Sequence, residues 1–376
     1  MRVALKEAVW ERDGETLLVV CDHSKAIELH DPTGQVETLL RVLADQPGPY
    51  AVLRERLSEA GAEVTAEELE GALGALDALR LLRDPDAGVP AAEQGRYFSN
   101  FAFFELFVSR ETSAAEYQRR LREAHVLQLG TGGLGSNVLQ SLAGLGVGRL
   151  TLVDSDVVEP RNFARQFLYR EADIGCSKVE RAAAWLRAFH SGIEVNAIER
   201  WVAGPEDLTD LLDGVDLVVS GIDQPNQVDS WVNQACVYAA VPWVRGGMSG
   251  SQLLYFSVDP GRSACHACRA AAYGDDGATA SQLPRQAERA RQLSSQLDRL
   301  NRGIGPAAAL VGSLVAFEAL RYLTGFQPPY GAGADVIVEV ADGCQQRKEP
   351  WPADPDCQLC AAARAARDDL APEPAR

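Results

Sequence analysis

The chain has 376 residues, of which 46% are hydrophobic and 24% are charged, and its formal net charge is -17 at pH 7. Such values are typical of globular proteins and exclude a disordered or fibrous chain. The acidic balance argues against nucleic acid as a partner, because phosphate binding depends on clustered Lys and Arg. A chain of this length predicts two domains with appendages.

No apolar segment behind a basic flank opens the sequence, so we expect no secretory signal. The longest apolar run, Pro306 to Leu323, contains Ser313, Glu318 and Arg321. These polar residues favour a buried helix over a membrane span. We therefore expect a cytoplasmic protein without a membrane partner.

The first segment, to about residue 88, predicts a small α+β domain of the winged-helix type. Strands are expected at 2–5, 16–21 and 26–29, and helices at 36–43, 51–60 and from residue 65 onward. Thr65 and Glu68 form the Thr-x-x-Glu arrangement that caps a helix start. The following leucines recur at helical spacing and predict one buried face: Leu69, Leu73, Leu76 and Leu79.

Winged helices commonly bind DNA, but the charge of this segment disfavours that function. Residues 1–93 contain nine Lys or Arg and nineteen Asp or Glu. An acidic surface repels DNA. The pattern instead resembles the PqqD-like precursor-peptide recognition domain that is fused to peptide-modifying enzymes. This resemblance implies that residues 1–88 bind a leader peptide, which adds a strand beside the small sheet.

The segment 89–124 is predicted to be a linker followed by helices. Residues 84–95 are rich in Pro, Gly and Ala, residues 96–106 are strongly aromatic, and residues 114–124 predict a helix with three arginines. We interpret these aromatic and arginine side chains as packed and solvated groups.

The segment from His125 to Asp154 has the order of a nucleotide-binding site. His125 to Leu129 predicts a strand, a glycine turn follows, a helix continues from Ser136, and Arg149 to Asp154 predicts a second strand. Backbone N–H groups in such a turn approach phosphates. Four glycines supply the permissive backbone: Gly130, Gly132, Gly133 and Gly135. The Asp154 carboxylate can accept both ribose hydroxyls, and a turn residue at the strand end is the alternative.

Four polar residues downstream indicate which class of nucleotide-binding enzyme this is: Asn162, Arg165, Gln166 and Lys178. Hydride transfer needs no such cluster. A reaction at the α-phosphate of ATP does, because Arg and Lys neutralise charge on the transferring phosphoryl group and on pyrophosphate. Taken singly, each residue has an alternative role as a surface charge or salt-bridge partner.

A third strand, Val215 to Ser220, leads to Asp223 at the same carboxyl edge of the predicted sheet. A carboxylate at this edge can hold magnesium against the phosphates. The alternative is a cap for a helix at residues 226–235.

Four of the eight cysteines form two Cys-x-x-Cys pairs: Cys265, Cys268, Cys357 and Cys360. Two chelating thiolate pairs complete a tetrahedral zinc shell without an open position, which is the structural pattern. A redox dithiol is the competing interpretation, but two separate copies favour joint coordination. Between the pairs, the polar residues 273–301 predict a loop or exposed helix, and residues 363–376 predict a flexible tail.

Together the motifs resemble the ThiF, MoeB and MccB group of adenylyltransferases, relatives of the ubiquitin-activating enzymes. The resemblance runs from about Arg96 to Cys360 and rests on the glycine turn, Asp154-x-Asp156, Asn162-x-x-Arg-Gln166, Asp173-x-Gly-x-x-Lys178, Asp223, and Arg302-Gly-Ile-Gly-Pro306 with Gly312 and Glu318 beyond it. It implies an α/β fold with a Rossmann-like, largely parallel sheet over residues 125–362, and a homodimer with contacts in residues 89–124. It also implies that ATP and magnesium are bound by Gly133, Asp154, Asn162, Arg165, Lys178 and Asp223.

The sequence departs from this group at two places. Many relatives have Arg-Tyr-x-Arg ahead of the nucleotide domain, and the second Arg reaches into the partner subunit's site, but Ser99 takes its place here. Relatives that form a thioester carry a cysteine in the crossover segment, yet none lies between Cys268 and Cys344. We therefore expect no thioester intermediate.

We expect an ATP-dependent adenylyltransferase that activates a carboxylate of a ribosomally made precursor peptide, as MccB-like enzymes do in peptide natural-product maturation. An activator of a ubiquitin-like sulfur carrier, as in ThiF and MoeB, is the alternative, although it leaves residues 1–88 without a task. A peptide-presenting scaffold without catalysis is the alternative from another class.

Overall fold

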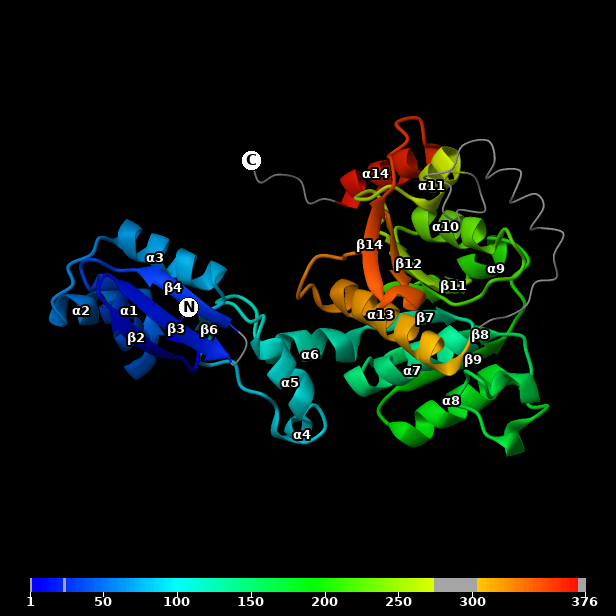
Figure 1. Ribbon diagram of the computed structural model, residues 1–376, viewed down its shortest axis with the longest axis horizontal. Coiled ribbons are helices and arrows are strands. Elements are labelled where there is room, and N and C mark those ends of the chain that lie inside the picture. The colour runs from blue at the N-terminus through cyan, green and yellow to red at the C-terminus, as the bar shows by residue number, and fades with distance from the viewer. Residues whose placement is uncertain (1, 23–24, 274–302, 371–376) are drawn as a thin grey trace. The chain divides into compact units, whose positions relative to one another are not determined.

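The computed structural model describes residues 2–22, 25–273 and 303–370 (Figure 1). The chain divides into two compact units, residues 1–120 (unit 1) and 121–376 (unit 2). Most of the predicted polar segment at 273–301, and Arg302 of the predicted Arg-Gly-Ile-Gly-Pro motif, lie outside the described residues.

Unit 1 contains two small antiparallel sheets, each with three described strands, in the orders β5-β1-β6 and β2-β3-β4. The strands are β1 (Arg2–Leu5), β2 (Val9–Asp13), β3 (Thr16–Asp22), β4 (Lys25–His30), β5 (Gly48–Pro49) and β6 (Leu82–Arg83). The helices that begin within this unit are α1 (Gln35–Asp45), α2 (Tyr50–Glu59), α3 (Ala66–Ala78), α4 (Ala91–Gln94), α5 (Phe98–Glu105) and α6 (Ala114–Glu123).

The core of unit 1 is a leucine-rich cluster shared by the strands and by α1, α2 and α3. Along β3, Leu17 and Val19 are buried in this core while Leu18 between them is exposed. Period-2 alternation therefore turns one face of β2-β3-β4 toward the helices and the other toward solvent. The predicted cap of α3 is confirmed, because the Thr65 hydroxyl accepts the Glu68 N–H and the Glu68 carboxylate accepts the Thr65 N–H.

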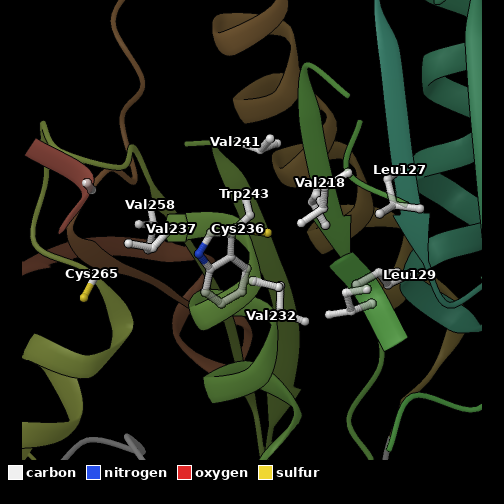
Figure 2. Close-up of a cluster of buried hydrophobic side chains, with 14 of the residues drawn as sticks. Leu127, Leu129, Val218, Val232, Cys236, Val237, Val241, Trp243, Val258 and Cys265 are labelled. Carbon is white, nitrogen blue, oxygen red and sulfur yellow. The ribbon is translucent and has the colours of Figure 1, made fainter. Parts of the chain in front are cut away.

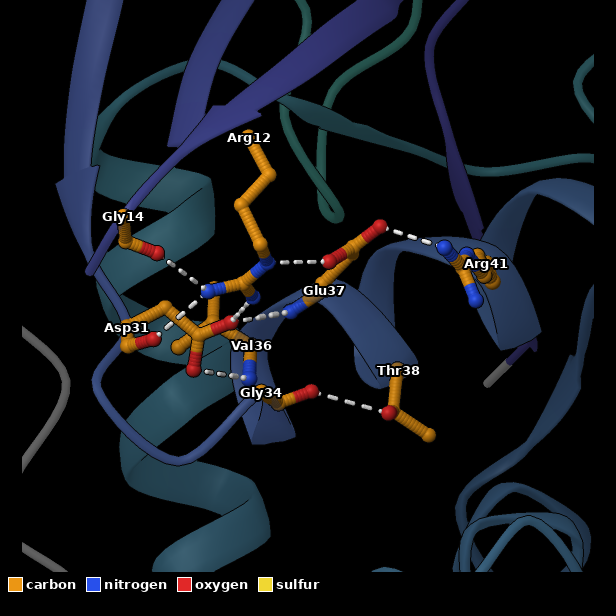
Figure 3. A network of polar contacts seen from close by, with 8 residues as sticks. All are labelled: Arg12, Gly14, Asp31, Gly34, Val36, Glu37, Thr38 and Arg41. Atoms are coloured by element: carbon orange, nitrogen blue, oxygen red, sulfur yellow. Dashed lines mark hydrogen bonds and ion pairs between the residues drawn. The ribbon is translucent and has the colours of Figure 1, made fainter. Parts of the chain in front are cut away.

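A polar network attaches the β2–β3 hairpin to the start of α1 (Figure 3). The Asp31 carboxylate accepts the N–H groups of Val36 (3.0 Å) and Glu37 (3.1 Å), which lie in the first turn of the helix. Arg12 on β2 pairs with Asp31 and, through Nε, with Glu37 Oε2 at 2.6 Å. The Arg12 guanidinium holds the pKa of Glu37 below its usual value. The network fixes how the sheet and the helix join.

The described residues of unit 2 form an eight-stranded sheet in the order β14-β13-β12-β11-β10-β7-β8-β9. The five strands from β11 to β9 in this order run parallel, and β12, β13 and β14 extend the sheet in antiparallel fashion. The strands are β7 (His125–Leu129), β8 (Arg149–Asp154), β9 (Glu194–Glu199), β10 (Leu217–Ser220), β11 (Trp243–Ser249), β12 (Gln252–Val258), β13 (Ala334–Glu339) and β14 (Gln345–Pro350). The predicted α/β fold with a mostly parallel sheet is confirmed.

Helices cover both faces of this sheet, as Figure 1 shows. One layer contains α7 (Gly133–Leu145), α8 (Lys178–Phe189) and α13 (Gly305–Thr324), and the other contains α9 (Glu206–Thr209), α10 (Val228–Tyr238), α11 (His266–Tyr273) and α14 (Gln358–Leu370). β7 lies between β8 and β10. The strands that follow it in the chain, β8 and β9, are added on one side of β7, and β10 is added on the other side. Such a switch point opens a crevice at the carboxyl ends of the strands, where ligands bind.

The core of unit 2 on the α10 side surrounds Trp243, which is fully buried (Figure 2). The Trp243 ring meets Phe256 edge-on at 5.2 Å between centroids. Cys265 and the three other paired cysteines belong to the same buried cluster. The cysteine site is therefore continuous with the hydrophobic core.

The predicted buried helix at 306–323 is α13. Its apolar composition would allow it to cross a membrane, but 61% of that window is buried in the structure. A Cβ atom at Gly312 would lie 2.6 Å from Asn137 Cβ on α7, so only glycine permits this close approach of the two helices. The predicted tail from residue 363 overlaps α14, in which Ala363 is buried, and residues 371–376 lie outside the described residues.

Candidate nucleotide site and metal centre

The glycine turn between β7 and α7 closes tightly on itself. Gly130 has a φ of +85°, a conformation that L side chains rarely adopt. A Cβ atom at Gly135 would lie 2.0 Å from the carbonyl oxygen of Gly130. Glycine is therefore required at both positions, and the first N–H groups of α7 face the carboxyl edge of the sheet.

The carboxylate of Asp154, at the end of β8, holds this turn in place. Its Oδ2 accepts the Thr131 N–H at 2.7 Å and the Thr131 hydroxyl at 2.8 Å, and its Oδ1 accepts the Asp156 N–H at 2.8 Å. Asp154 thus has the turn role that the sequence offered as the alternative. The predicted contact with ribose hydroxyls stays a prediction.

Tyr169, which belongs to none of the sequence motifs above, supports the same turn. Its hydroxyl donates to the carbonyl oxygen of Thr131 at 2.7 Å, and burial raises the pKa of the phenol. Its position three residues after Gln166 carries no sequence pattern that would have identified this contact.

Asn162, Arg165 and Gln166 come together on a short turn over the glycines. The buried Asn162 side chain accepts the Glu159 N–H at 2.9 Å and so fixes the 3-10 turn η1 (Pro160–Asn162). A Cβ atom at Gly133 would lie 3.1 Å from Arg165 Cδ, so the arginine side chain lies across the start of α7. Gln166 is buried, and its Oε1 has no hydrogen-bond partner among the described residues. An orphan acceptor at this place fits a bound polar ligand.

Lys178 is the first residue of α8 and points at Asp156. Its Nζ donates to Asp156 Oδ2 at 2.7 Å, and its side chain is 6% exposed whereas that of Asp156 is 61% exposed. A buried ammonium group at the site edge, with an exposed partner that can move away, suits contact with an anionic substrate.

Asp223 lies three residues beyond β10 and is exposed. The helix-cap alternative is wrong, because α10 begins at Val228 after Gln227 and has no side-chain cap. Within residues 2–22, 25–273 and 303–370, the Asp223 carboxylate has no hydrogen bond or ion pair. A free carboxylate at this edge fits the oxygen ligands that magnesium prefers. The glycine turn, Asp154 and Asp223 follow three adjacent strands, β7, β8 and β10.

The four paired cysteines lie together in the core. Their Sγ atoms are within 4.8 Å of one another, with Cys265 at 4.0 Å from Cys268 and at 3.7 Å from Cys357, and Cys268 at 3.6 Å from Cys360. Zinc bonded to four sulfurs at about 2.3 Å in a tetrahedron requires sulfurs about 3.8 Å apart. The four thiols therefore fit zinc, and their joint position argues against two separate redox pairs.

The same local geometry holds each pair. Cys265 and Cys357 immediately precede α11 and α14, and their partners lie in the first turns of those helices. A hydrogen bond from Cys360 lowers the pKa of the Cys265 thiol to about 5 against the effect of burial. Helix N-termini also favour thiolates, which are the form that binds a metal.

A buried ion pair braces this centre. Arg269 on α11 donates through Nε to both carboxylate oxygens of Asp335 on β13, at 3.1 and 3.0 Å. Burial raises the pKa of Asp335, and the guanidinium opposes that effect. The Arg269 guanidinium also lies over the rings of Phe256 and Trp351, at 5.7 and 5.6 Å. Helix α11, which carries Cys268, is thereby attached to the antiparallel part of the sheet.

The ThiF family model matches residues 105–358, which include the sheet, the glycine turn and three of the four paired cysteines. The chain belongs to the ThiF family. The predicted family resemblance is confirmed, and this ThiF-family adenylyltransferase has curated relatives of the same kind. Molybdopterin-synthase adenylyltransferase of Salmonella typhimurium is 30% identical over 248 residues, which cover 65% of this chain and 90% of the relative.

Solved structures resemble the ThiF-family chain over a longer stretch. Escherichia coli MccB has a TM-score of 0.75 at 20% identity, and the match covers 96% of this chain and 97% of that one. The same protein, a microcin C7 biosynthetic enzyme, has been solved with ATP and with N-formylated MccA. This likeness shows that the fold of both units is shared.

Proposed function

We propose that this ThiF-family adenylyltransferase activates a carboxylate of a ribosomally made precursor peptide as an acyl-adenylate during peptide natural-product maturation. The observation that carries the proposal is the structural likeness to MccB over 96% of the chain, which includes unit 1. MccB has been solved with MccA bound. Unit 1 then holds the leader of the peptide, and unit 2 performs the transfer.

The site residues have separate roles in this reaction. A carboxylate oxygen of the peptide attacks the α-phosphorus of ATP, the new P–O bond forms, and the bond to pyrophosphate breaks. Arg165 and Lys178 neutralise charge on the transferring group and on the departing pyrophosphate. N–H groups from Gly130 to Gly135 bind phosphate, and Asn162, Gln166 and Asp154 orient the nucleotide.

Asp223 is the residue that would hold magnesium, which supplies charge neutralisation on the phosphates. The four cysteines would hold a structural zinc ion away from the chemistry. No cysteine lies between Cys268 and Cys344, so we propose that the acyl-adenylate is resolved without a thioester. None of the eight cysteines forms a disulfide bond in the structure, which is compatible with a protein of the reducing cytoplasm.

The second candidate function is activation of a ubiquitin-like sulfur-carrier protein. The identity to molybdopterin-synthase adenylyltransferases of Salmonella typhimurium and Escherichia coli favours it. Those matches cover 65% of this chain, however, and leave unit 1 without a task. A scaffold that only presents peptide would explain unit 1 but would not need the charged residues around the glycine turn.

ATP–pyrophosphate exchange separates these three functions. We expect the protein with ATP and magnesium to exchange labelled pyrophosphate when its precursor peptide is added, and a short open reading frame beside its gene would supply the peptide to test. We expect no exchange with a sulfur carrier that ends in Gly-Gly. Exchange with the carrier alone would favour the second candidate, and the absence of exchange and of AMP release with both substrates would favour the scaffold.

We also propose a homodimer, supported by an open apolar groove between α7 and α13. The groove has a volume of about 310 Å³ and is lined by Gly144, Leu145, Ala316 and Phe317, among others. Phe317 is 50% exposed. Apolar surface of this kind on two adjacent helices is typical of a subunit contact.

Replacement of Phe317 by aspartate should therefore weaken the dimer by at least tenfold, because a charge at a buried contact loses its hydration. Light scattering after size exclusion, over a range of concentrations, measures the mass. Phe189→Asp, at a similarly exposed ring on α8, is the matched control. A wild-type monomer, or an F317D dimer as stable as the wild type, would contradict the proposed interface.

A further inference from the structure

A further charged group lies at the carboxyl edge of the sheet, on β11. Arg245 belongs to none of the sequence motifs above. Strand register pairs it with Ser220, the last residue of β10, and Ser220 with Leu129, the last residue of β7. Arg245 therefore lies level with the ends of the two strands that lead to the glycine turn and to Asp223.

Arg245 points to the α10 side of the sheet. Trp243, two residues before it, belongs to the core on that side (Figure 2), and period-2 alternation places Arg245 on the same face. Its Nε donates to Asp229 Oδ1, in the first turn of α10, at 2.8 Å. Arg165 lies at the start of α7 and Lys178 at the start of α8, both in the opposite helix layer (Figure 1). The crevice at this edge thus has cationic groups on both sides.

The Arg245 guanidinium has a donor that the chain does not use. Nε bonds Asp229 and Nη1 bonds the Gly246 carbonyl oxygen, but Nη2 has no hydrogen-bond partner within residues 2–22, 25–273 and 303–370. Beside it, Ser220 is fully buried, and its hydroxyl also has no partner among the described residues. Two such groups at one place fit a bound polar ligand.

Gly247 leaves space for that ligand. It follows Arg245 by two residues on the same face of β11, and a Cβ atom there would lie 3.3 Å from Arg245 Nη1. A larger residue would therefore crowd the guanidinium. The Arg245 side chain is 14% exposed, so a ligand can reach it in a place that is largely removed from water, where charge-assisted hydrogen bonds are strong.

The surrounding charges favour a carboxylate as the ligand. Asp229 already offsets the charge of Arg245 and repels a second anion in proportion to its charge, so a carboxylate fits better than a polyphosphate. In-line displacement at phosphorus places the attacking oxygen opposite the leaving one. Because Arg165 and Lys178 are proposed to neutralise pyrophosphate, we expect the attacking carboxylate on the side of Arg245.

We propose that Arg245 binds the carboxylate that is activated and so makes the site selective for an anionic acceptor over its neutral amide. This inference rests on the proposed function and names the residue that recognises the reacting group. Nη2 donates to one carboxylate oxygen, and the other oxygen attacks the α-phosphorus, so that the new P–O bond forms as the bond to pyrophosphate breaks. Attack removes the negative charge of the carboxylate. The ion pair is therefore strongest before the transition state and contributes to the affinity for the acceptor, not to the rate of transfer.

Replacement of Arg245 by glutamine should raise the KM of the acceptor about tenfold, the cost of one charge-assisted hydrogen bond. The probe is the precursor peptide that supports ATP–pyrophosphate exchange in the wild-type protein. The kcat of exchange should stay within about threefold of the wild type, and the KM of ATP should not change. Arg149→Gln is the matched control, because Arg149 begins β8 at the other end of the sheet and pairs through Nε with Glu194 at 3.1 Å.

Asp229→Asn tests the same pairing in the opposite direction. The asparagine oxygen can still accept the Nε hydrogen, but it no longer competes as a charge for the guanidinium. We expect the KM of the acceptor to fall about threefold. An ion pair that only attaches β11 to α10 would be weakened by both variants, so a KM that both variants raise would overturn the proposal.

Calorimetric titration in the presence of α,β-methylene-ATP separates recognition from catalysis, because this analogue cannot transfer its adenylyl group. The peptide is compared with a synthetic form in which the reacting carboxyl group is an amide. The wild-type protein should bind the amide about tenfold more weakly, and R245Q should bind both forms equally. Arg245→Lys keeps the charge and should recover most of the discrimination.

The outcomes separate the inference from the function on which it rests. Equal discrimination between the two peptides by R245Q and by the wild type would overturn Arg245 as the carboxylate site and leave the proposed function standing. A wild-type protein that shows no exchange with the peptide would overturn both. Thermal melts confirm that the variants fold, and the Asp229→Asn and amide comparisons test the proposal without R245Q.

Discussion

Replacement of Lys178 by alanine should lower the rate of ATP–pyrophosphate exchange about 100- to 1000-fold, the usual cost of removing one group that stabilises transition-state charge. The ammonium group donates a hydrogen bond of 2.7 Å to Asp156 Oδ2 at the edge of the site. It lies next to the glycine turn, in which the Thr131 carbonyl oxygen accepts a hydrogen bond from the Tyr169 hydroxyl. Without it, one of the two cationic side chains proposed to neutralise negative charge on the transferring phosphoryl group and on pyrophosphate is lost, and Arg165 remains.

The fold should tolerate this substitution. Removing Lys178 leaves Asp156, which is 61% exposed and regains water, so no buried charge is left unpaired. We expect the thermal midpoint to change by no more than about 3 °C, the shift that about 1 kcal/mol produces in a unit of this size. Loss of activity at unchanged stability would thus indicate a role in the reaction.

Exchange is measured with the substrate that supports it in the wild-type protein, and peptide binding is measured beside it. Lys348→Ala on β14 is the matched control, because Lys348 is an exposed lysine whose ammonium group lies over the Tyr330 ring, at 4.7 Å from its centroid. The control should keep full exchange. If K178A retained exchange within threefold of the wild type, Lys178 would not act on the phosphates.

Replacement of Cys360 by serine is expected to remove the bound zinc and to lower the thermal midpoint of the protein by about 6–20 °C. Structural zinc contributes strongly to folding, and a loss of about 3–5 kcal/mol in a unit of this size corresponds to that range. The effect should extend beyond the metal, because the four cysteines belong to the core cluster around Trp243. Without the metal, the cysteine pairs at the starts of α11 and α14 would no longer link these two helices.

Elemental analysis of the purified protein and a thermal melt measure the two effects together. Wild-type protein should contain one zinc ion per chain. Cys344→Ser is the matched control, since Cys344 is exposed in the β13–β14 turn and takes no part in the thiol cluster. A wild-type protein that contains no metal, or a C360S variant with an unchanged melting midpoint, would show that the centre is not a zinc site.

Local patterns in the chain predicted the strongest features correctly. The glycine turn, the cap of α3 and the buried helix α13 each depend on residues that are neighbours in sequence, so propensity and spacing are sufficient to predict them. The β2 strand was not predicted, and neither were β9 and the strands that carry the sheet beyond β10. Strand pairing depends on partners far along the chain, which a short window does not contain.

The candidate site shows the same division between features that local sequence predicts and features that depend on distant segments. Sequence alone determined the residue types that nucleotide and metal chemistry need, because turns and Cys-x-x-Cys pairs fix their own local geometry. The tertiary structure decided which groups meet: Asp154 with Thr131, Lys178 with Asp156, and Arg269 with Asp335 across 66 residues. It also decided that Asp223 does not cap α10 and that Leu18 faces outward. These contacts follow from strand order and register, which arise only when distant segments pack together.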